Sequence, residues 1–320
     1  MSSANAGSAG PNAGPAGSNA GAKLLRRRAE IVRQVRAFFE QRDFLEVDTP
    51  LLIPSPGLDL HLQAFQVGGR YLSTSPEYQM KRLLADGYAR IFQITRAFRQ
   101  GELGSRHNPE FTILEFYRAN AGVPEVMRDT EELVEAVTGG EVRLGARRIA
   151  TRAPFARMTL CEAYERFAKI APDETLAMAT SDEDRFFRVL VDEVEPRIAE
   201  LDHALFLTEY PAPQASLARK KPADPRVAER FELYVAGVEL CNGFGELTDP
   251  VEQRARFEQD QRDRRERGLP VYPIDERFLQ ALERGMPDSG GNAVGLDRLI
   301  AVASGTTAIR EVMAFADDEL

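Results

Sequence analysis

Four short stretches of this sequence combine residue types that can bind phosphates, amines or metal ions. They are Ser75-Pro76-Glu77; Arg99 with Glu102, His107 and Asn108; Glu239 with Asn242 and Glu246; and Asp297-Arg298. A planar guanidinium can contact two phosphate oxygens at once, so Arg99 and Arg298 are candidates for binding a nucleotide. Neither the GxxxxGKS/T loop nor the GxGxxG loop occurs in the chain, which argues against glycine-rich phosphate loops.

The glutamates of these stretches need a positive charge beside them if they share one site. Glu239 and Glu246 are candidates for Mg²⁺ ligands, and Glu77, Glu115 or Glu246 could hold an amine. Each stretch is weak evidence on its own, because Arg and Glu are abundant in this chain. Only their joint order along the sequence is specific.

Two predicted strands must position the arginine stretch. Residues 90–98 and 110–117 have the alternation of strands, and the polar loop 99–109 joins them as a long hairpin. In the second strand, alternation places Phe111, Ile113, Glu115 and Tyr117 on one face. A carboxylate between apolar neighbours requires a cationic or hydrogen-bonding partner, so this face is a candidate pocket wall.

Helices and further strands surround this hairpin. Residues 24–39 carry apolar side chains at helical spacing, and residues 44–52 indicate a strand that ends among prolines. Residues 123–205 are predicted to form a helical insertion. Strand patterns return at 203–211, 230–244 and 291–299, with a solvated helix over 249–268. Hairpin strands with helices between them predict an α+β fold with a mostly antiparallel sheet flanked by helices.

The joint order of these stretches resembles the catalytic core of the class II aminoacyl-tRNA synthetases, in particular the lysyl-tRNA synthetases. The first helix with FLEVDTP is similar to motif 1, ITRAFRQGELGSRHNPEFTILEFY to motif 2 and GNAVGLDRL to motif 3. TSPEYQMKRLL, HNPEFT and VELCNGFGELTD resemble the lysine-specific members. The resemblance covers residues 23–320, which we expect to form one catalytic domain.

The sequence leaves no room before motif 1 for an anticodon-binding β-barrel. In this respect the chain is similar to the elongation factor P–lysine ligases. Members of that family attach (R)-β-lysine to a lysine side chain of elongation factor P.

The resemblance implies an ATP site along motifs 2 and 3. Arg99 is expected to contact the α-phosphate and to stabilise the charge that develops as the amino-acid carboxylate attacks it. Arg298 and His107 are expected to hold the outer phosphates, and Phe111 to stack on adenine. The implied catalytic residues are Arg99 and Arg298, and the implied ATP-binding residues are Arg99, Gln100, Gly101, Glu102, His107, Asn108, Phe111, Glu239, Leu240, Gly295 and Arg298.

The same resemblance implies an amino-acid pocket and a magnesium site. Ser75 and Glu77 are expected to bind the amino group near the carboxyl end of the substrate, and Glu115 and Tyr117 to bind the far ammonium. Mg²⁺ is expected on Glu239 and Glu246, with Glu246 also near the amine. The implied substrate-binding residues are Ser75, Pro76, Glu77, Glu115, Tyr117, Asn242, Glu246 and Ala293.

Two positions depart from the synthetase pattern. Gly101 stands where a Glu usually follows the motif 2 arginine by two residues, so the adenine contact is expected to shift to Glu102 or to backbone groups. Ala293 replaces a motif 3 glycine, as in the ligase family, and one methyl group can discriminate by ~1–3 kcal/mol in a tight pocket. Strict alternation also places Glu239 and Asn242 on opposite faces, so a β-bulge is required between them.

Composition excludes several classes of protein. The 320 residues include 41 Lys+Arg against 50 Asp+Glu, and this acidity argues against binding nucleic acid by bulk charge. Two cysteines and three histidines argue against a disulfide framework and a zinc enzyme. No apolar run approaches the ~20 residues of a membrane span, so we expect a cytoplasmic protein. Residues 1–22 contain only Ala, Gly, Ser, Asn and Pro after Met1, which predicts a disordered tail.

The resemblance to the ligase family implies an ATP-dependent, AMP-forming ligase that transfers (R)-β-lysine to elongation factor P, with lysine as a weaker substrate. ATP and Mg²⁺ are the expected cofactors, a homodimer built by motif 1 is the expected assembly, and no tRNA is expected to bind. Three alternatives stay open: a minimal lysyl-tRNA synthetase, an amide-forming ligase for a small molecule, and a non-catalytic regulatory paralogue. Retention of Arg99, Glu239, Glu246 and Arg298 argues against the last.

Overall fold

The computed structural model describes residues 19–60 and 62–320. Helix α1 (Asn19–Glu40) begins at Asn19, so residues 19–22 belong to this helix and not to the predicted tail. Residues 1–18 lie outside the described residues, and their disorder stays a prediction.

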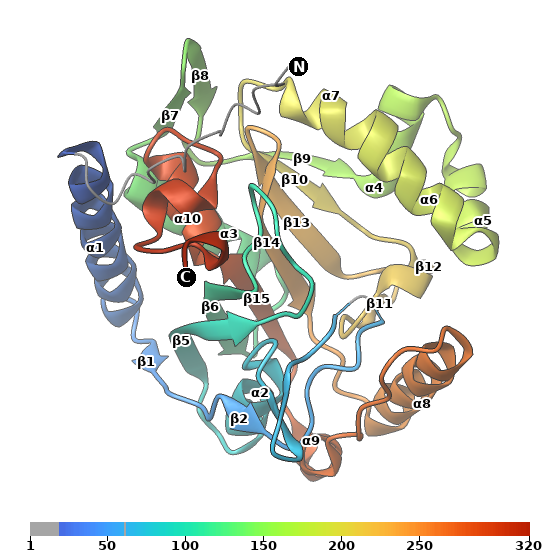
Figure 1. The fold of residues 1–320 in the computed structure, drawn as a ribbon. Coiled ribbons are helices and arrows are strands. Elements are labelled where there is room, and N and C mark those ends of the chain that lie inside the picture. The colour runs from blue at the N-terminus through green and yellow to red at the C-terminus, as the bar shows by residue number, and fades with distance from the viewer. Residues whose placement is uncertain (1–18, 61) are drawn as a thin grey trace, which may run out of the picture.

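A mixed, mostly antiparallel sheet of eight strands forms the centre of the molecule (Figure 1). Only the pairs β1–β5 and β9–β10, at its two edges, are parallel. The predicted α+β class with a mostly antiparallel sheet is therefore confirmed. In spatial order the strands are β1 (Leu45–Glu46), β5 (Arg90–Phe98), β6 (Glu110–Ala119), β15 (Ser289–Gly295), β14 (Val238–Gly245), β13 (Arg230–Val235), β10 (Leu205–Thr208) and β9 (Ala156–Thr159).

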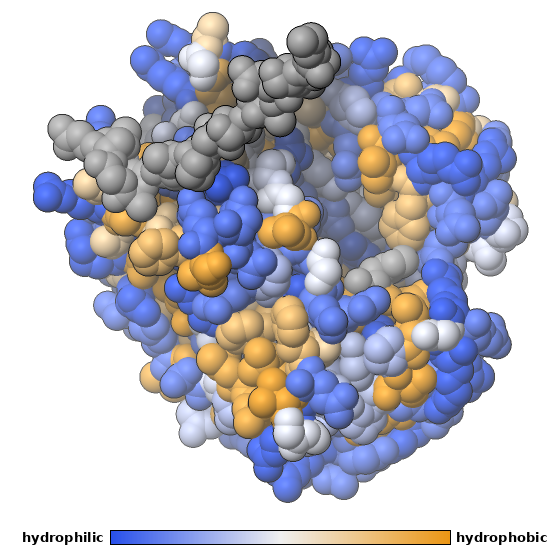
Figure 2. Space-filling model, in the orientation of Figure 1, coloured by the Kyte–Doolittle hydropathy of each residue, from blue (hydrophilic) through white to orange (hydrophobic). Residues whose placement is uncertain are grey.

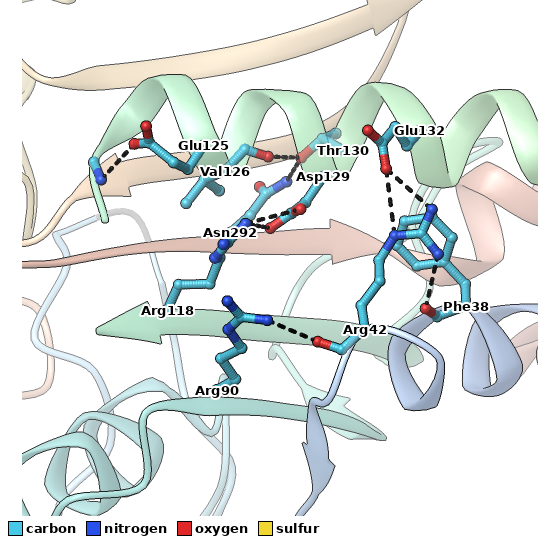
Figure 3. Close-up of polar contacts among 11 residues, drawn as sticks. Phe38, Arg42, Arg90, Arg118, Glu125, Val126, Asp129, Thr130, Glu132 and Asn292 are labelled. Carbon is cyan, nitrogen blue, oxygen red and sulfur yellow. Dashed lines mark hydrogen bonds and ion pairs between the residues drawn. The ribbon is translucent and has the colours of Figure 1, made fainter. Parts of the chain in front are cut away.

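One face of this sheet is sealed by helices α1, α3 (Val123–Thr138) and α10 (Leu296–Ala303). Leu114 and Phe116 on β6 and Val294 on β15 point into the large core beneath these helices. Figure 3 shows how polar side chains also join α3 to the strands: Arg118 on β6 contacts Asp129 at 2.8 Å, and Asn292 on β15 donates to Thr130 at 2.8 Å. Because side chains alternate along a strand, the residues between these face the other side.

The opposite face is only partly covered. Helices α2 (Glu77–Ala85), α8 (Pro250–Glu266) and α9 (Glu276–Gly285) pack there around a second core that includes Tyr78, Phe257 and Phe278. The apolar side chains of α9 lie on one side of the helix and explain its burial. Although α8 was expected to be a solvated helix, its Arg264 is fully buried and donates to the backbone oxygens of Asp59, Leu62 and Pro270.

Residues 123–205 are not wholly helical, which corrects the predicted insertion. They contain α3, the hairpin β7 (Glu141–Leu144)–β8 (Arg147–Ala150) and the sheet strand β9. The helical arm is limited to 160–199 and packs around its own small core with Tyr164 and Phe186. Its members are α4 (Leu160–Ala163), π-helix η2 (Tyr164–Ala168), α5 (Pro172–Ser181), α6 (Glu183–Val189), π-helix η3 (Leu190–Val194) and α7 (Glu195–Ala199).

Shorter elements border the open face. The strand predicted over 44–52 is reduced to β1 and the start of β2, because prolines cannot donate to a strand ladder. The remaining elements are β2 (Leu52–Ile53), β3 (Gln66–Val67), β4 (Arg70–Leu72), β11 (Lys220–Lys221), β12 (Asp224–Ala228) and the 3₁₀ turns η4 (Ala212–Gln214), η5 (Ile309–Val312) and η6 (Asp317–Glu319). Among the described residues, no helix has the length and apolar character required to span a bilayer.

Candidate active site

A cavity of about 850 Å³ lies over the open face of the sheet. Figure 2 shows the hollow between the helical arm and the body of the molecule. Most residues predicted to bind ATP or substrate line it: Ser75, Glu77, Arg99, Glu102, His107, Asn108, Phe111, Glu115, Glu239, Leu240, Asn242, Ala293, Gly295 and Arg298. Pro76, Gln100, Gly101, Tyr117 and Glu246 are not among the lining residues.

A row of side chains runs directly across this face of the sheet, and its members Glu115, Ala293 and Asn242 form the floor of the cavity. Glu115 on β6 faces Ala293 on β15, which faces Asn242 on β14, which faces Glu232 on β13. Cross-strand partners share a face, so these four side chains point the same way. Gln93 continues the row on β5 opposite Glu115.

The bulge required by the sequence is present in β14. Leu233 pairs with Cys241 and Tyr234 with Glu239, so Leu240 is the extra residue. This insertion places Glu239 on the same face as Asn242, and the prediction of a bulge is confirmed.

At one end of the cavity, Glu115 is fully buried and held by two hydroxyl groups. Ser75 Oγ donates to Oε1 at 2.5 Å, and the Tyr117 hydroxyl donates to Oε2 at 2.7 Å. Burial, and then the charge of Glu77, raise the pKa of Glu115 to about 7. A bound ammonium group would favour the ionised carboxylate, so this is a binding position for an amine.

A residue that the sequence reasoning did not single out, Lys81 on α2, completes this end. Its Nζ lies 2.6 Å from Glu77 Oε1 and 2.5 Å from Glu246 Oε2, with no exposed side-chain surface. Burial raises the pKa of Glu246 to about 8, although Lys81 opposes this shift. The available signal was the spacing of Glu77 and Lys81 at i and i+4, which places both side chains on one face if the segment is helical.

Gly291 is a second residue that was missed. It faces Tyr117 across β15 and β6, and a Cβ there would overlap with the Tyr117 ring and with Glu246 Oε1. Only glycine lets the carboxylate and the phenol approach each other beside Glu115.

At the other end of the cavity, Arg298, near the start of α10, contacts several polar groups. It donates from Nη1 to the Glu239 backbone oxygen at 2.9 Å, and its Nη2 lies 2.7 Å from His107 Nε2. Partial burial, followed by the positive charge of Arg298, lowers the pKa of His107, so a neutral ring accepts this hydrogen bond. The predicted phosphate-binding pair therefore lies together.

Arg99 lies near this group and faces Phe111. Its guanidinium carbon is 5.0 Å from the centre of the Phe111 ring, and Nη1 is 3.6 Å from Glu102 Oε1. Gly101 has φ +85°, a conformation that L side chains rarely adopt, so its identity has a backbone reason. The loop turns Gln100 and Gly101 away from the cavity, whereas Glu102 lines it.

Two polar contacts support this end from behind. Asn108 donates to the Glu110 oxygen at 2.7 Å and accepts from the Asp317 N–H at 3.0 Å, so its amide anchors η6 while it lines the cavity. Asp297 accepts from Arg28 of α1 at 2.5 Å and from the Thr112 N–H at 2.7 Å. The start of α10, and with it Arg298, is thereby fixed to α1 and to β6.

The structure corrects the expected metal pair. Glu239 is near the start of β14 and Glu246 follows its end, so at ~3.3 Å per residue they are separated by roughly 20 Å. Mg²⁺ binds oxygen at ~2.0–2.1 Å and cannot bridge that span. Instead, Glu239 shares a face with Glu232, and the pKa of Glu239 is raised by burial and then by the charge of Glu232. The turn at Ala236-Gly237 that brings these strands together was not anticipated.

Two comparisons with known proteins accompany this geometry. The family model described as tRNA synthetases class II (D, K and N) matches residues 18–319. A curated protein from Klebsiella pneumoniae (strain 342), named elongation factor P--(R)-beta-lysine ligase, is 41% identical over 321 residues, 92% of this chain and 95% of that protein. The protein of the same name from Edwardsiella ictaluri (strain 93-146) is 44% identical over 312 residues, again 92% of this chain and 95% of that protein.

Proposed function

This chain belongs to the class II tRNA synthetases of the D, K and N type, and we propose that it is an ATP-dependent ligase that attaches (R)-β-lysine to a lysine of elongation factor P. The names of its relatives in Klebsiella and Edwardsiella support both the amino acid and the acceptor. The acidity of the chain favours a protein acceptor over tRNA.

The observation that supports this proposal is the charge at the end of the cavity that contains Glu115 and Lys81, which we call the amine end; the end that contains Arg99 and Arg298 is the phosphate end. Glu77, Glu115 and Glu246 are gathered there, and within residues 19–60 and 62–320 Lys81 is the one ammonium that contacts this group. When all are ionised, three carboxylates and one ammonium leave two negative charges. Lysine and β-lysine each bring two ammonium groups, so a diamino acid neutralises the pocket and a substrate with one amine does not.

The residues at the other end suit the first chemical step. The substrate carboxylate attacks the α-phosphorus of ATP, the bond to the β-phosphate oxygen breaks, and pyrophosphate leaves. Arg99 and Arg298 are cations that line the cavity, and they neutralise the charge that develops on the phosphate oxygens. Their present partners, Glu102, Glu239 and His107, hold them at this end of the cavity.

The second step is transfer to the acceptor. The ε-amine of the acceptor lysine attacks the acyl carbon of the adenylate, an amide forms and AMP leaves. No covalent intermediate on the enzyme is required, and positioning of the two substrates supplies most of the rate.

Glu232 and Glu239 fit Mg²⁺ better than the pair inferred from the sequence. Both are carboxylates on one face of the β13–β14 hairpin, where Glu232 pairs with Arg230 at 2.6 Å and Glu239 with Arg298 at 3.3 Å. A divalent cation bound between them would further offset their mutual repulsion. Within residues 19–60 and 62–320, no three His, Cys, Asp or Glu side chains form a metal cluster. Mg²⁺ commonly uses one or two carboxylates together with substrate phosphates, which agrees with this sparse donor set. When bound, the ion neutralises charge on the phosphates.

The proposal includes a homodimer in the cytoplasm. Leu45, Leu51 and Leu52 next to α1 expose 51%, 36% and 41% of their surface, and motif 1 is the expected dimer contact. Cys161 and Cys241 are free thiols, as a reducing compartment requires.

An acceptor assay tests the function directly. The protein is incubated with ATP, Mg²⁺ and either (R)-β-lysine or lysine, with either unmodified elongation factor P or bulk tRNA, and mass spectrometry follows the acceptor. We expect a gain of one lysyl unit on elongation factor P, larger with β-lysine, and none on tRNA. Charging of tRNA alone would make the chain a minimal synthetase, and no adenylate with either amino acid would make it a regulatory paralogue.

A further inference from the structure

Lys81 lies in the middle of the amine end but cannot contact solvent. Its side chain has 0% exposure, as has the whole of Glu115, and the side chain of Glu246 has 1%. A buried ammonium without partners is strongly disfavoured, so its surroundings must account for its charge.

The contacts of Lys81 meet that requirement. An ammonium group has three N–H donors. Glu77 Oε1 lies 2.6 Å and Glu246 Oε2 2.5 Å from Nζ, and the centre of the Phe244 ring is 5.9 Å away. These two carboxylates, despite the opposing effect of burial, raise the pKa of Lys81, so the residue is a permanent cation.

Lys81 also connects parts of the chain that reach the pocket separately. Glu77 begins helix α2, whereas Glu246 follows strand β14 and is linked through its N–H to the Ser289 oxygen of β15 at 2.9 Å. Glu77 lines the cavity, and its backbone N–H donates a hydrogen bond to Ser75 Oγ at 3.1 Å. Through Ser75, this chain of contacts continues to Glu115.

We propose that Lys81 is a positioning and specificity residue, an internal counter-ion that bridges Glu77 and Glu246 and limits the pocket to two substrate ammonium groups. This inference rests on the proposed function and deepens it. Lys81 does not touch the reacting atoms. It neutralises one of three carboxylates, so that the other two charges are available to the substrate.

A purely architectural role makes a different prediction. If Lys81 only filled space beneath α2, its loss would lower stability and would weaken ATP and amino-acid binding together. If it positions the carboxylates, its loss damages the amine end alone. Arg99 donates to the Thr74 backbone oxygen and Arg298 to the Glu239 backbone oxygen, not to the carboxylates that pair with Lys81.

The test compares Lys81→Met with Lys81→Arg in the full-length protein. Methionine has nearly the length of lysine without its charge, and Arg keeps the charge in a larger, planar group. Adenylate formation is measured by pyrophosphate exchange with (R)-β-lysine, together with the melting temperature. For Lys81→Met we expect the KM for β-lysine to rise by ~tenfold or more, with the KM for ATP within about twofold of the parent value.

Lys169→Met is the matched control, because Lys169 is exposed. Within the part of the chain that the structure describes, its ammonium donates only to the Arg166 oxygen. Equal increases in both KM values, or an unchanged KM for β-lysine, would overturn the proposal. If Lys81→Met does not fold, Lys81→Gln replaces it: a raised KM for β-lysine alone, restored toward the parent value in Lys81→Arg, supports the counter-ion, and a parent-like KM for β-lysine in Lys81→Gln overturns it. Inactivity of the parent enzyme in this exchange would instead refute the proposed function.

Discussion

The two ends of the cavity differ in burial and in how firmly their charges are paired. At the amine end, Lys81, Glu115 and Glu246 have 0% exposure and contacts of 2.5–2.7 Å. At the phosphate end, the side chains of Arg99 and Arg298 are 25% and 20% exposed, and their carboxylate partners lie at 3.6 and 3.3 Å.

This difference follows from what each end must bind. Ammonium groups are small, and a buried set of carboxylates can select them by number and position because the local dielectric is low. Phosphates are large and multiply charged, so their site must stay open. Its arginines are paired loosely with the carboxylates of Glu102 and Glu239, which incoming phosphates can replace.

The largest effect is expected from Arg298→Ala, which removes the centre of the phosphate end. Arg298 joins His107 to Glu239, and its loss should lower pyrophosphate exchange by ~10²–10³ or more, because transition-state charge is then unbalanced. The amine end should be unaffected, so equilibrium binding of lysine without ATP should stay near the parent value.

Arg143→Ala is a suitable control, since Arg143 is 67% exposed on the β7–β8 hairpin. Near-normal pyrophosphate exchange in Arg298→Ala would contradict the assignment of the phosphate end to ATP. Equal loss of lysine binding would show that the two ends are not independent.

A smaller effect is expected from Glu115→Gln, which should weaken lysine binding at the amine end and leave ATP binding unchanged. Glutamine keeps the shape but not the charge, so the KM for lysine should rise ~10–100-fold while the KM for ATP stays constant. In the parent enzyme Glu115 has a pKa raised to about 7, so the carboxylate is protonated below that pH. The KM for lysine should therefore fall as pH rises from 6 to 8, and Glu115→Gln should flatten this dependence.

The control here is Glu200→Gln, because Glu200 is 67% exposed and pairs only loosely with Arg197 at 3.3 Å. A parallel rise in the KM for ATP would mean that Glu115 supports the whole site. An unchanged pH profile would mean that another group, such as Glu246, controls binding.

Much of the frame could be predicted from the sequence because it depends on local patterns. Alternation in 90–117 predicted β5 and β6, and the conflict between Glu239 and Asn242 predicted the bulge. The side-chain partners could not be predicted in the same way. The approach of Lys81 to Glu246 depends on how α2 packs under the sheet, and the approach of Glu232 to Glu239 depends on a turn at Ala236-Gly237.

The same reasoning explains why the structure separates the predicted metal pair but brings together the residues predicted to bind the far ammonium. Glu115 and Tyr117 are two residues apart on one strand, so a single period places them together. Glu239 and Glu246 were paired by their charge and by the resemblance, and six residues of an extended strand lie between them. A prediction that two residues lie close together is most secure when both residues belong to the same strand or helix.

The smallest effect is expected from Ala293→Gly, at the row of side chains that joins the two ends. Ala293 lies between Glu115 and Asn242 on the cavity floor, so its methyl group would lie beside the backbone of a substrate bound at the amine end. An α-amino group lies one carbon closer to the carboxylate than a β-amino group and needs part of that space. Removal of the methyl group should therefore raise kcat/KM for lysine relative to (R)-β-lysine by about tenfold, the effect of one methyl group in a tight pocket.

Both substrates are measured by pyrophosphate exchange, and the KM for ATP should not change. Glycine within a strand also lowers stability by ~0.5–1 kcal/mol, which the melting temperature reports separately. A shift in this ratio without a change in ATP binding would confine specificity to the buried end, whereas no shift would leave the position of the carboxylates, and hence Lys81, as the source of selection.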